Sequence, residues 1–235
     1  MDSVLGGMIA ANLIVAVAAF LQASVGVGFA MIAVPLLLIL DPELVPVPVL
    51  SAMTVLAAAM LIRERDAFDR KGVMALLPGL SVGVVFAMLF LPLLPANMDR
   101  LFGLLIVAAV VWSIWGPVVH MTRNTLFVAG TLAGAMGTVS GLHGPALAIA
   151  YQRYAPAQAR ATIAGVFIVA SILSILALLL SAASDTRDLI AGLGLLPGTL
   201  IGFGATFILP RPAPKLARNA MLTVAFVSAL ALLAP

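Results

Sequence analysis

The sequence contains no cysteine, and this absence excludes disulfide bonds, thiolate metal sites and cysteine nucleophiles from its 235 residues. Charged side chains are also scarce, because Asp, Glu, Lys and Arg together make up 9% of the chain. Soluble domains carry about 25%, so these few charges cannot cover a globule with a solvated surface. The 12 Lys and Arg residues face 9 Asp and Glu residues and form no block that could follow a phosphate backbone, which excludes a nucleic-acid partner.

Apolar side chains are what the sequence has in excess. Hydrophobic residues make up 63% of the chain, and the mean hydropathy is +1.23. These values are typical of a chain whose solvent is a lipid bilayer. The sequence therefore predicts an all-α polytopic membrane protein.

The lengths of the apolar stretches indicate which of them cross the membrane, since a spanning helix needs about 20 residues. The pair of stretches inside 125–152 is too short for two crossings, so we expect a re-entrant hairpin there. The earlier pair, inside 4–40, could be a hairpin or one full helix followed by a broken one. Six stretches are long enough to span: 44–62, 73–91, 101–119, 161–181, 189–209 and 218–234.

The positions of Lys and Arg predict the orientation of the chain. Loop 63–71 carries Arg63, Arg65, Arg70 and Lys71, which places it in the cytoplasm by the positive-inside rule. Alternating sides from that loop leaves only two basic residues outside. We therefore expect a multi-pass protein of the cell membrane with both termini outside the cytoplasm.

The two halves of the chain resemble each other. Residues 76–83, LLPGLSVG, recur as residues 195–202, LLPGTLIG. Loop 63–71 is basic whereas its counterpart 182–188 carries one Arg and two Asp, so equivalent loops have exchanged sign. This exchange predicts an inverted repeat, with a first half of residues 1–119 and a second half of residues 120–235.

Each half opens with an interrupted helix, at residues 24–29 (the first tip) and at residues 140–145 (the second tip). A short apolar helix follows each tip, and its amino-terminal N–H groups would attract an anion. Pro145 suits the first turn of such a helix. Alternatively, the glycines only allow helices to pack closely. The glycines in question are Gly26, Gly28, Gly141 and Gly144.

His143 is the one titratable side chain expected deep in the membrane. It could donate to the anion, carry a coupling proton, or bond a neighbouring carbonyl. The polar residues beside the tips could add neutral donors or bond their own backbone. The full set of candidate substrate-binding residues is Gln22, Ser24, Gly26, Gly28, Phe29, Thr138, Ser140, Gly141, His143, Gly144 and Pro145.

The chemistry of an enzyme is not visible in the sequence. It has no nucleotide-binding loop, no paired carboxylates in an apolar stretch and no acidic partner for His143 at membrane depth. We therefore expect no catalytic residues, no cofactor and no metal.

The motifs at the two tips resemble the TauE/SafE family of sulfite and organosulfonate exporters. The resemblance rests on Gly26-x-Gly28 followed by Pro35-Leu36-Leu37, and on Gly141-x-x-Gly144-Pro145 in the second half. The duplicated Leu-Pro-Gly-x-x-x-x-Gly helices are also similar to the family. Phe29 and Ala30 stand where the family usually has further glycines, which narrows the first tip. The resemblance implies a multi-pass carrier of small sulfur-containing anions.

The leading hypothesis is a secondary transporter that exports sulfite or a sulfonate by alternating access, with the anion held between the two tips near the midplane. The alternatives are an anion channel, an importer of a sulfur compound such as thiosulfate, and a membrane scaffold. A homodimer would suit such a fold, although no residue in the sequence indicates one.

Overall fold

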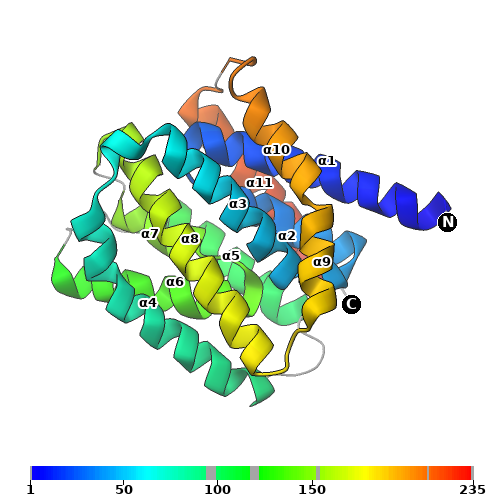
Figure 1. Ribbon diagram of the computed structural model, residues 1–235, viewed down its shortest axis with the longest axis horizontal. Coiled ribbons are helices and arrows are strands. Elements are labelled where there is room, and N and C mark those ends of the chain that lie inside the picture. The colour runs from blue at the N-terminus through cyan, green and yellow to red at the C-terminus, as the bar shows by residue number, and fades with distance from the viewer. Residues whose placement is uncertain (1, 94–98, 117–121, 152–153, 211, 234–235) are drawn as a thin grey trace.

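The computed structural model describes residues 2–93, 99–116, 122–151, 154–210 and 212–233, and the described chain is helical without a β-strand (Figure 1). The predicted boundary between the halves, at residues 119 and 120, lies outside the described residues. The all-α prediction is confirmed. In chain order the helices are α1 (Asp2–Val25), α2 (Phe29–Leu40), α3 (Val47–Arg63), α4 (Arg70–Phe90), α5 (Asp99–Trp115), α6 (Arg123–Ser140), α7 (Gly144–Ala150), α8 (Pro156–Leu180), α9 (Thr186–Gly194), α10 (Leu196–Ala205) and α11 (Pro214–Leu233).

Four segments of the described chain are long and apolar enough to cross a membrane: Leu5–Val25, Arg70–Leu93, Pro156–Leu180 and Thr186–Ala205. The last three correspond to the predicted spans 73–91, 161–181 and 189–209. The other three predicted spans fold as shorter apolar helices: Val47–Arg63, Arg100–Trp115 and Arg218–Leu233. In the first pair of stretches, α1 is long enough to cross a membrane, whereas α2 is a short continuous helix of 12 residues.

Many large apolar side chains lie on the outside of the bundle. Trp115, Leu180 and Ile208 are each at least 75% exposed. In water such a surface would be a binding patch or an aggregation site, whereas in a bilayer it meets apolar lipid tails. The outer surface therefore fits a multi-pass membrane protein.

Helices α3 and α8 run side by side across the middle of the bundle, with α4 and α6 on one side and α1 and α10 on the other (Figure 1). The crossing of α4 and α6 depends on glycine. A Cβ atom on Gly79 would lie 2.0 Å from the carbonyl oxygen of Phe127, and one on Gly83 would lie 2.1 Å from that of Thr131. The backbones of the two helices are thus in direct contact, as small residues four apart allow.

The crossing of α10 and α1 likewise depends on two glycines four residues apart. A Cβ atom on Gly198 would lie 2.2 Å from the carbonyl oxygen of Asn12, and one on Gly202 would lie 2.1 Å from that of Ala16. The partners in α1 precede those in α6 by 115 positions in both cases, the same offset that separates Gly26 of the first tip from Gly141 of the second. Small residues four apart on an apolar helix predict such close packing, and the structure confirms it for both glycine pairs of the repeated motif.

A break in the segment 186–205 separates α9 from α10 at Leu195, and the side chain of Asn12 fills it. The amide Nδ2 of Asn12 donates to the carbonyl oxygen of Gly194 at 2.9 Å, and its Oδ1 accepts from the N–H of Gly198 at 2.7 Å. Pro197, which has no N–H, lies between these two groups. By contrast, the repeated motif in α4 forms a continuous helix with Pro78 inside it.

A methyl group added at Gly202 should destabilise the protein, whereas a methyl group added at Gly204 should not. In Gly202→Ala the new Cβ meets a backbone oxygen that no rotamer change can move, so α10 and α1 must separate. We expect a cost of about 1–3 kcal/mol. Gly204→Ala is the control because nothing lies within 4 Å of its Cβ. Thermal unfolding in detergent, followed by tryptophan fluorescence, should show a lower Tm for Gly202→Ala only. Equal Tm values for the two variants would contradict this packing.

Candidate functional site

The first tip is a glycine turn that joins α1 to α2. Gly26 has a φ angle of 108° and Gly28 one of 119°, a region that L side chains rarely adopt. The missing Cβ atoms also make room for neighbours: on Gly26 a Cβ would lie 2.6 Å from Cγ of Arg160, and on Gly28 it would lie 2.0 Å from Sδ of Met221. The backbone conformation therefore requires glycine at both positions, and the missing Cβ atoms leave room for the side chains of Arg160 and Met221.

The side chain of Gln22 closes the first tip from inside. Its Oε1 accepts from the N–H of Phe29, the first residue of α2, at 2.8 Å, and its Nε2 donates to Sδ of Met53 at 3.1 Å. Gln22 is completely buried. Gln22 therefore accepts a hydrogen bond from one of the N–H groups that we expected to attract an anion, and this bond holds the start of α2.

The second tip joins α6 to α7. Gly141 follows α6 with a φ angle of 77°, and its N–H donates to the carbonyl oxygen of Gly137 at 2.8 Å. Pro145 lies in the first turn of α7, as predicted. Gly144 has no conformational need for glycine, and the nearest atom to an added Cβ would be Cζ of Phe167 at 3.9 Å. Gly141 is thus the residue that makes this turn.

His143 is completely buried between α6 and α8. Thr138 Oγ1 donates to the carbonyl oxygen of Gly134 at 2.8 Å and also lies 2.8 Å from Ser174 Oγ, which in turn lies 3.4 Å from His143 Nε2. Each hydroxyl has only one proton, so this chain is complete when Ser174 donates to Thr138 and Nε2–H of His143 donates to Ser174. A Cβ on Gly137 would overlap the imidazole ring, which explains the glycine at that position.

The remaining polar residues beside the tips bond their own helices. Ser24 Oγ donates to the carbonyl oxygen of Phe20 at 2.7 Å, and Ser140 Oγ donates to that of Met136 at 2.8 Å. Both bonds run from residue i to residue i−4, the usual alternative for a hydroxyl inside a helix. The proton of each hydroxyl is therefore used within its own helix.

A cavity of about 440 Å³ brings the two tips together. Gly28 reaches it from the first tip, and Gly144 and Pro145 reach it from the second. Its other walls come from α1, α2, α5, α7 and α11. Among the residues predicted from the sequence, these three line the cavity. The remaining lining residues are Val25, Val27, Met31, Ser113, Ala148, Lys215, Arg218, Met221 and Leu222.

Two cationic side chains of α11, Lys215 and Arg218, give the cavity a positive charge. Arg218 Nη2 donates to the carbonyl oxygen of Ser113 in α5, which fixes the guanidinium at the wall. Sequence reasoning assigned neither residue to the site and placed both in a cytoplasmic loop. They follow Pro145 by about 70 residues, and no motif in the sequence connects them to the tips. An apolar cavity with a few polar groups and a net positive charge is suited to a small organic or inorganic anion.

A comparison with protein families agrees with this geometry. The model of the family described as "Sulfite exporter TauE/SafE" matches residues 11–232, which is nearly the whole chain. No curated protein and no solved structure gives a significant match.

The two glycines of the second tip should respond differently to a methyl group. Gly141→Ala forces an L side chain into the left-handed region, which costs about 1–2 kcal/mol, so its Tm in detergent should fall. Gly144→Ala meets neither strain nor a close neighbour and should unfold at the wild-type temperature. If Gly144→Ala were the less stable of the two, the described turn would be wrong.

Proposed function

Since the chain belongs to the TauE/SafE family of sulfite exporters, we propose that it is a secondary transporter that exports sulfite or organosulfonates across the cell membrane. The family itself is one of membrane transporters for sulfite or related anions. The proposal adds the direction, the binding site and the alternating access.

The observation that carries the proposal is the cavity shared by both tips. Gly28 and Gly144 come from different halves of the sequence, yet they line one space together with Lys215 and Arg218. Sulfite and sulfonates present several oxygens and a negative charge, which match an ammonium and a guanidinium group. A volume of about 440 Å³ is enough for such a small anion.

The packing of the halves supports the proposed inverted repeat. The crossing of α4 with α6 and the crossing of α10 with α1 use glycine pairs from the same repeated motif. The helices around the cavity likewise come from both halves, with α2 from the first and α7 from the second. In inverted-repeat transporters the substrate lies at the interface of the repeats, and rocking of one bundle against the other alternates access.

The membrane potential would favour export by such a protein. Each negative charge that leaves an inside-negative cell gains about 2.3 kcal/mol per 100 mV, so no coupled ion is required. With loop 63–71 in the cytoplasm, the start of α11 is also cytoplasmic, and Lys215 and Arg218 then meet the anion where it enters. The proposed orientation and the proposed direction therefore agree.

The test is flux in proteoliposomes with an imposed potential. We expect wild-type protein to carry sulfite and a short alkanesulfonate saturably, driven by the potential. Lys215→Gln should raise KM about tenfold, equivalent to about 1.4 kcal/mol, because it removes a cation from the cavity wall. Lys71→Gln is the matched control, since Lys71 is exposed on α4 and does not line the cavity.

Each alternative has its own outcome in this experiment. Flux that rises linearly with concentration would identify an anion channel. Saturable flux of thiosulfate with none of sulfite or sulfonate would identify a carrier of another substrate. Absence of flux for every small anion tested would contradict a transporter and favour a scaffold.

A further inference from the structure

A buried ion pair joins the end of α3 to the start of α8. Nε of Arg160 lies 3.0 Å from both carboxylate oxygens of Glu64, and its Nη2 lies 2.9 Å from Oε1. The side chains are 13% and 12% exposed, so both charges have lost most of their water. Glu64 Oε1 also lies 3.8 Å from Nη2 of Arg63, whose side chain is 14% exposed, so Arg160 and Arg63 share this carboxylate. Removing the carboxylate would leave two buried cations without their anion, which is strongly unfavourable. The sequence placed Glu64 in the cytoplasmic loop 63–71 and gave no indication of its partner in α8.

A second ion pair in the same loop shows the contrast. Arg65 and Asp66 approach to 3.8 Å, but their side chains are 80% and 100% exposed. Exposed pairs of this kind contribute little because water and salt screen them. The two pairs therefore share sequence context and differ in burial.

The buried pair rests directly on the first tip. A Cβ on Gly26 would lie 2.6 Å from Cγ of Arg160 and 3.5 Å from its Cα and Cβ, so the backbone of the tip lies against this arginine. Two residues later, Gly28 lines the cavity. The tip therefore lies between the ion pair and the cavity wall.

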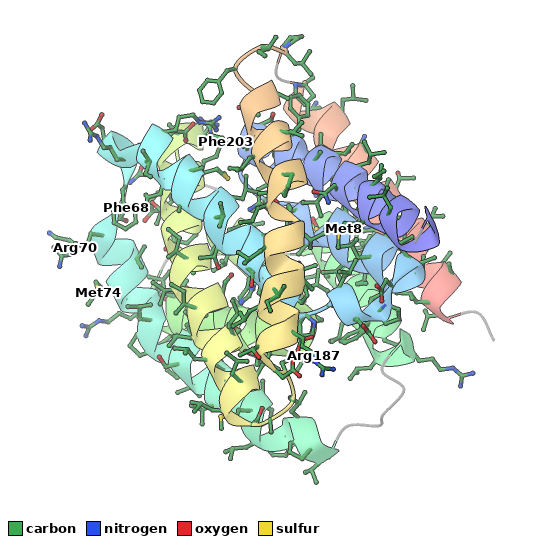
Figure 2. The ribbon with its side chains drawn as sticks, turned by 45° about the vertical axis from the view of Figure 1, so that its right-hand side comes forward. Met8, Phe68, Arg70, Met74, Arg187 and Phe203 are labelled. Carbon is green, nitrogen blue, oxygen red and sulfur yellow. The ribbon has the colours of Figure 1, made fainter. Side chains whose placement is uncertain are left out.

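Arg63, the neighbour of Glu64, ties the surrounding helices to the same place. Its Nη2 donates to the carbonyl oxygen of Ala23 in α1 at 2.6 Å, and its Nη1 donates to Thr206 Oγ1 at 2.8 Å. Its guanidinium also lies 5.0 Å from the ring centre of Phe203. Figure 2 shows Phe203 near one end of the rod formed by α9 and α10, with Arg187 near the other end. The ends of α1, α3 and α10 and the start of α8 therefore meet around the first tip.

We propose that Glu64 and Arg160 form a latch that holds the first tip seated over the cavity. With the latch closed, Arg160 packs against Gly26 and holds the tip in the position that the structure describes. When the pair separates, the tip is free to move, and the part of the cavity wall that it forms becomes more accessible to water. Glu64 and Arg160 are thus positioning residues for the proposed transport, and this last step rests on the proposed function.

The test uses the absence of cysteine, which allows one introduced thiol to be labelled without background. Val27→Cys places that thiol between Gly26 and Gly28, at a half-buried position on the cavity wall. In purified full-length protein in detergent, Glu64→Gln should increase the rate of labelling by a water-soluble thiol reagent about tenfold. Asp66→Asn is the matched control and should leave the rate unchanged.

Two further variants distinguish a latch from general loosening. Exchanging the charges, with Glu64→Arg and Arg160→Glu together, should return the rate of labelling toward that of the Val27→Cys protein. A thiol at Ala57, which is completely buried in α3, should stay unlabelled in the Glu64→Gln background. The proposal fails if Glu64→Gln labels no faster than Asp66→Asn, if the exchange does not slow labelling, or if the thiol at residue 57 becomes reactive as well.

Labelling needs no substrate, so the latch and the proposed function can fail separately. Where flux is measurable, Glu64→Gln should change the maximal rate and leave KM close to wild type, because the latch touches the tip and not the anion. Lys215→Gln should instead raise KM and leave the maximal rate close to wild type. A change in KM alone for Glu64→Gln would overturn its positioning role, whereas labelling results remain valid even if no anion is carried.

Discussion

The backbone groups that an interrupted helix leaves without partners are the constraint on which this structure depends. In a bilayer no water reaches them, so each must be satisfied inside the protein. At the first tip the N–H of Phe29 bonds to Gln22, and at the break between α9 and α10 the groups of Gly194 and Gly198 bond to Asn12. At the second tip Gly141 bonds back to α6 through its own N–H.

The turn at the first tip also determines which charged side chains lie near one another. The first tip turns the chain at the place where Arg160 meets Glu64, and the same turn carries Gly28 to the cavity with Lys215 and Arg218. One side of the tip therefore faces an ion pair and the other faces a positively charged space. Four of the 21 charged residues of the chain, Glu64, Arg160, Lys215 and Arg218, therefore lie around one glycine turn.

The sequence predicted the features that are local. Stretch lengths indicated the helices, the glycines at 26, 28 and 141 marked the turns, and the small-residue pairs marked the close crossings. It could not indicate which distant side chain fills each break. Asn12 and Gly198 are 186 positions apart, and nothing in the pattern around either residue points to the other. Lys215 and Arg218 were missed for the same reason, since a cation near a membrane surface reads as an anchor until the fold places it beside a cavity.

The central claim is that an anion occupies the cavity between the tips, and protection of a thiol there tests it most directly. Ala148→Cys places the thiol on α7 at the cavity wall, and Thr186→Cys places a control at the exposed start of α9. We predict that a short alkanesulfonate slows labelling of the thiol at residue 148 by N-ethylmaleimide, saturably, and leaves that at residue 186 unchanged. Equal labelling of the thiol at residue 148 with and without the sulfonate, at every concentration, would contradict the account.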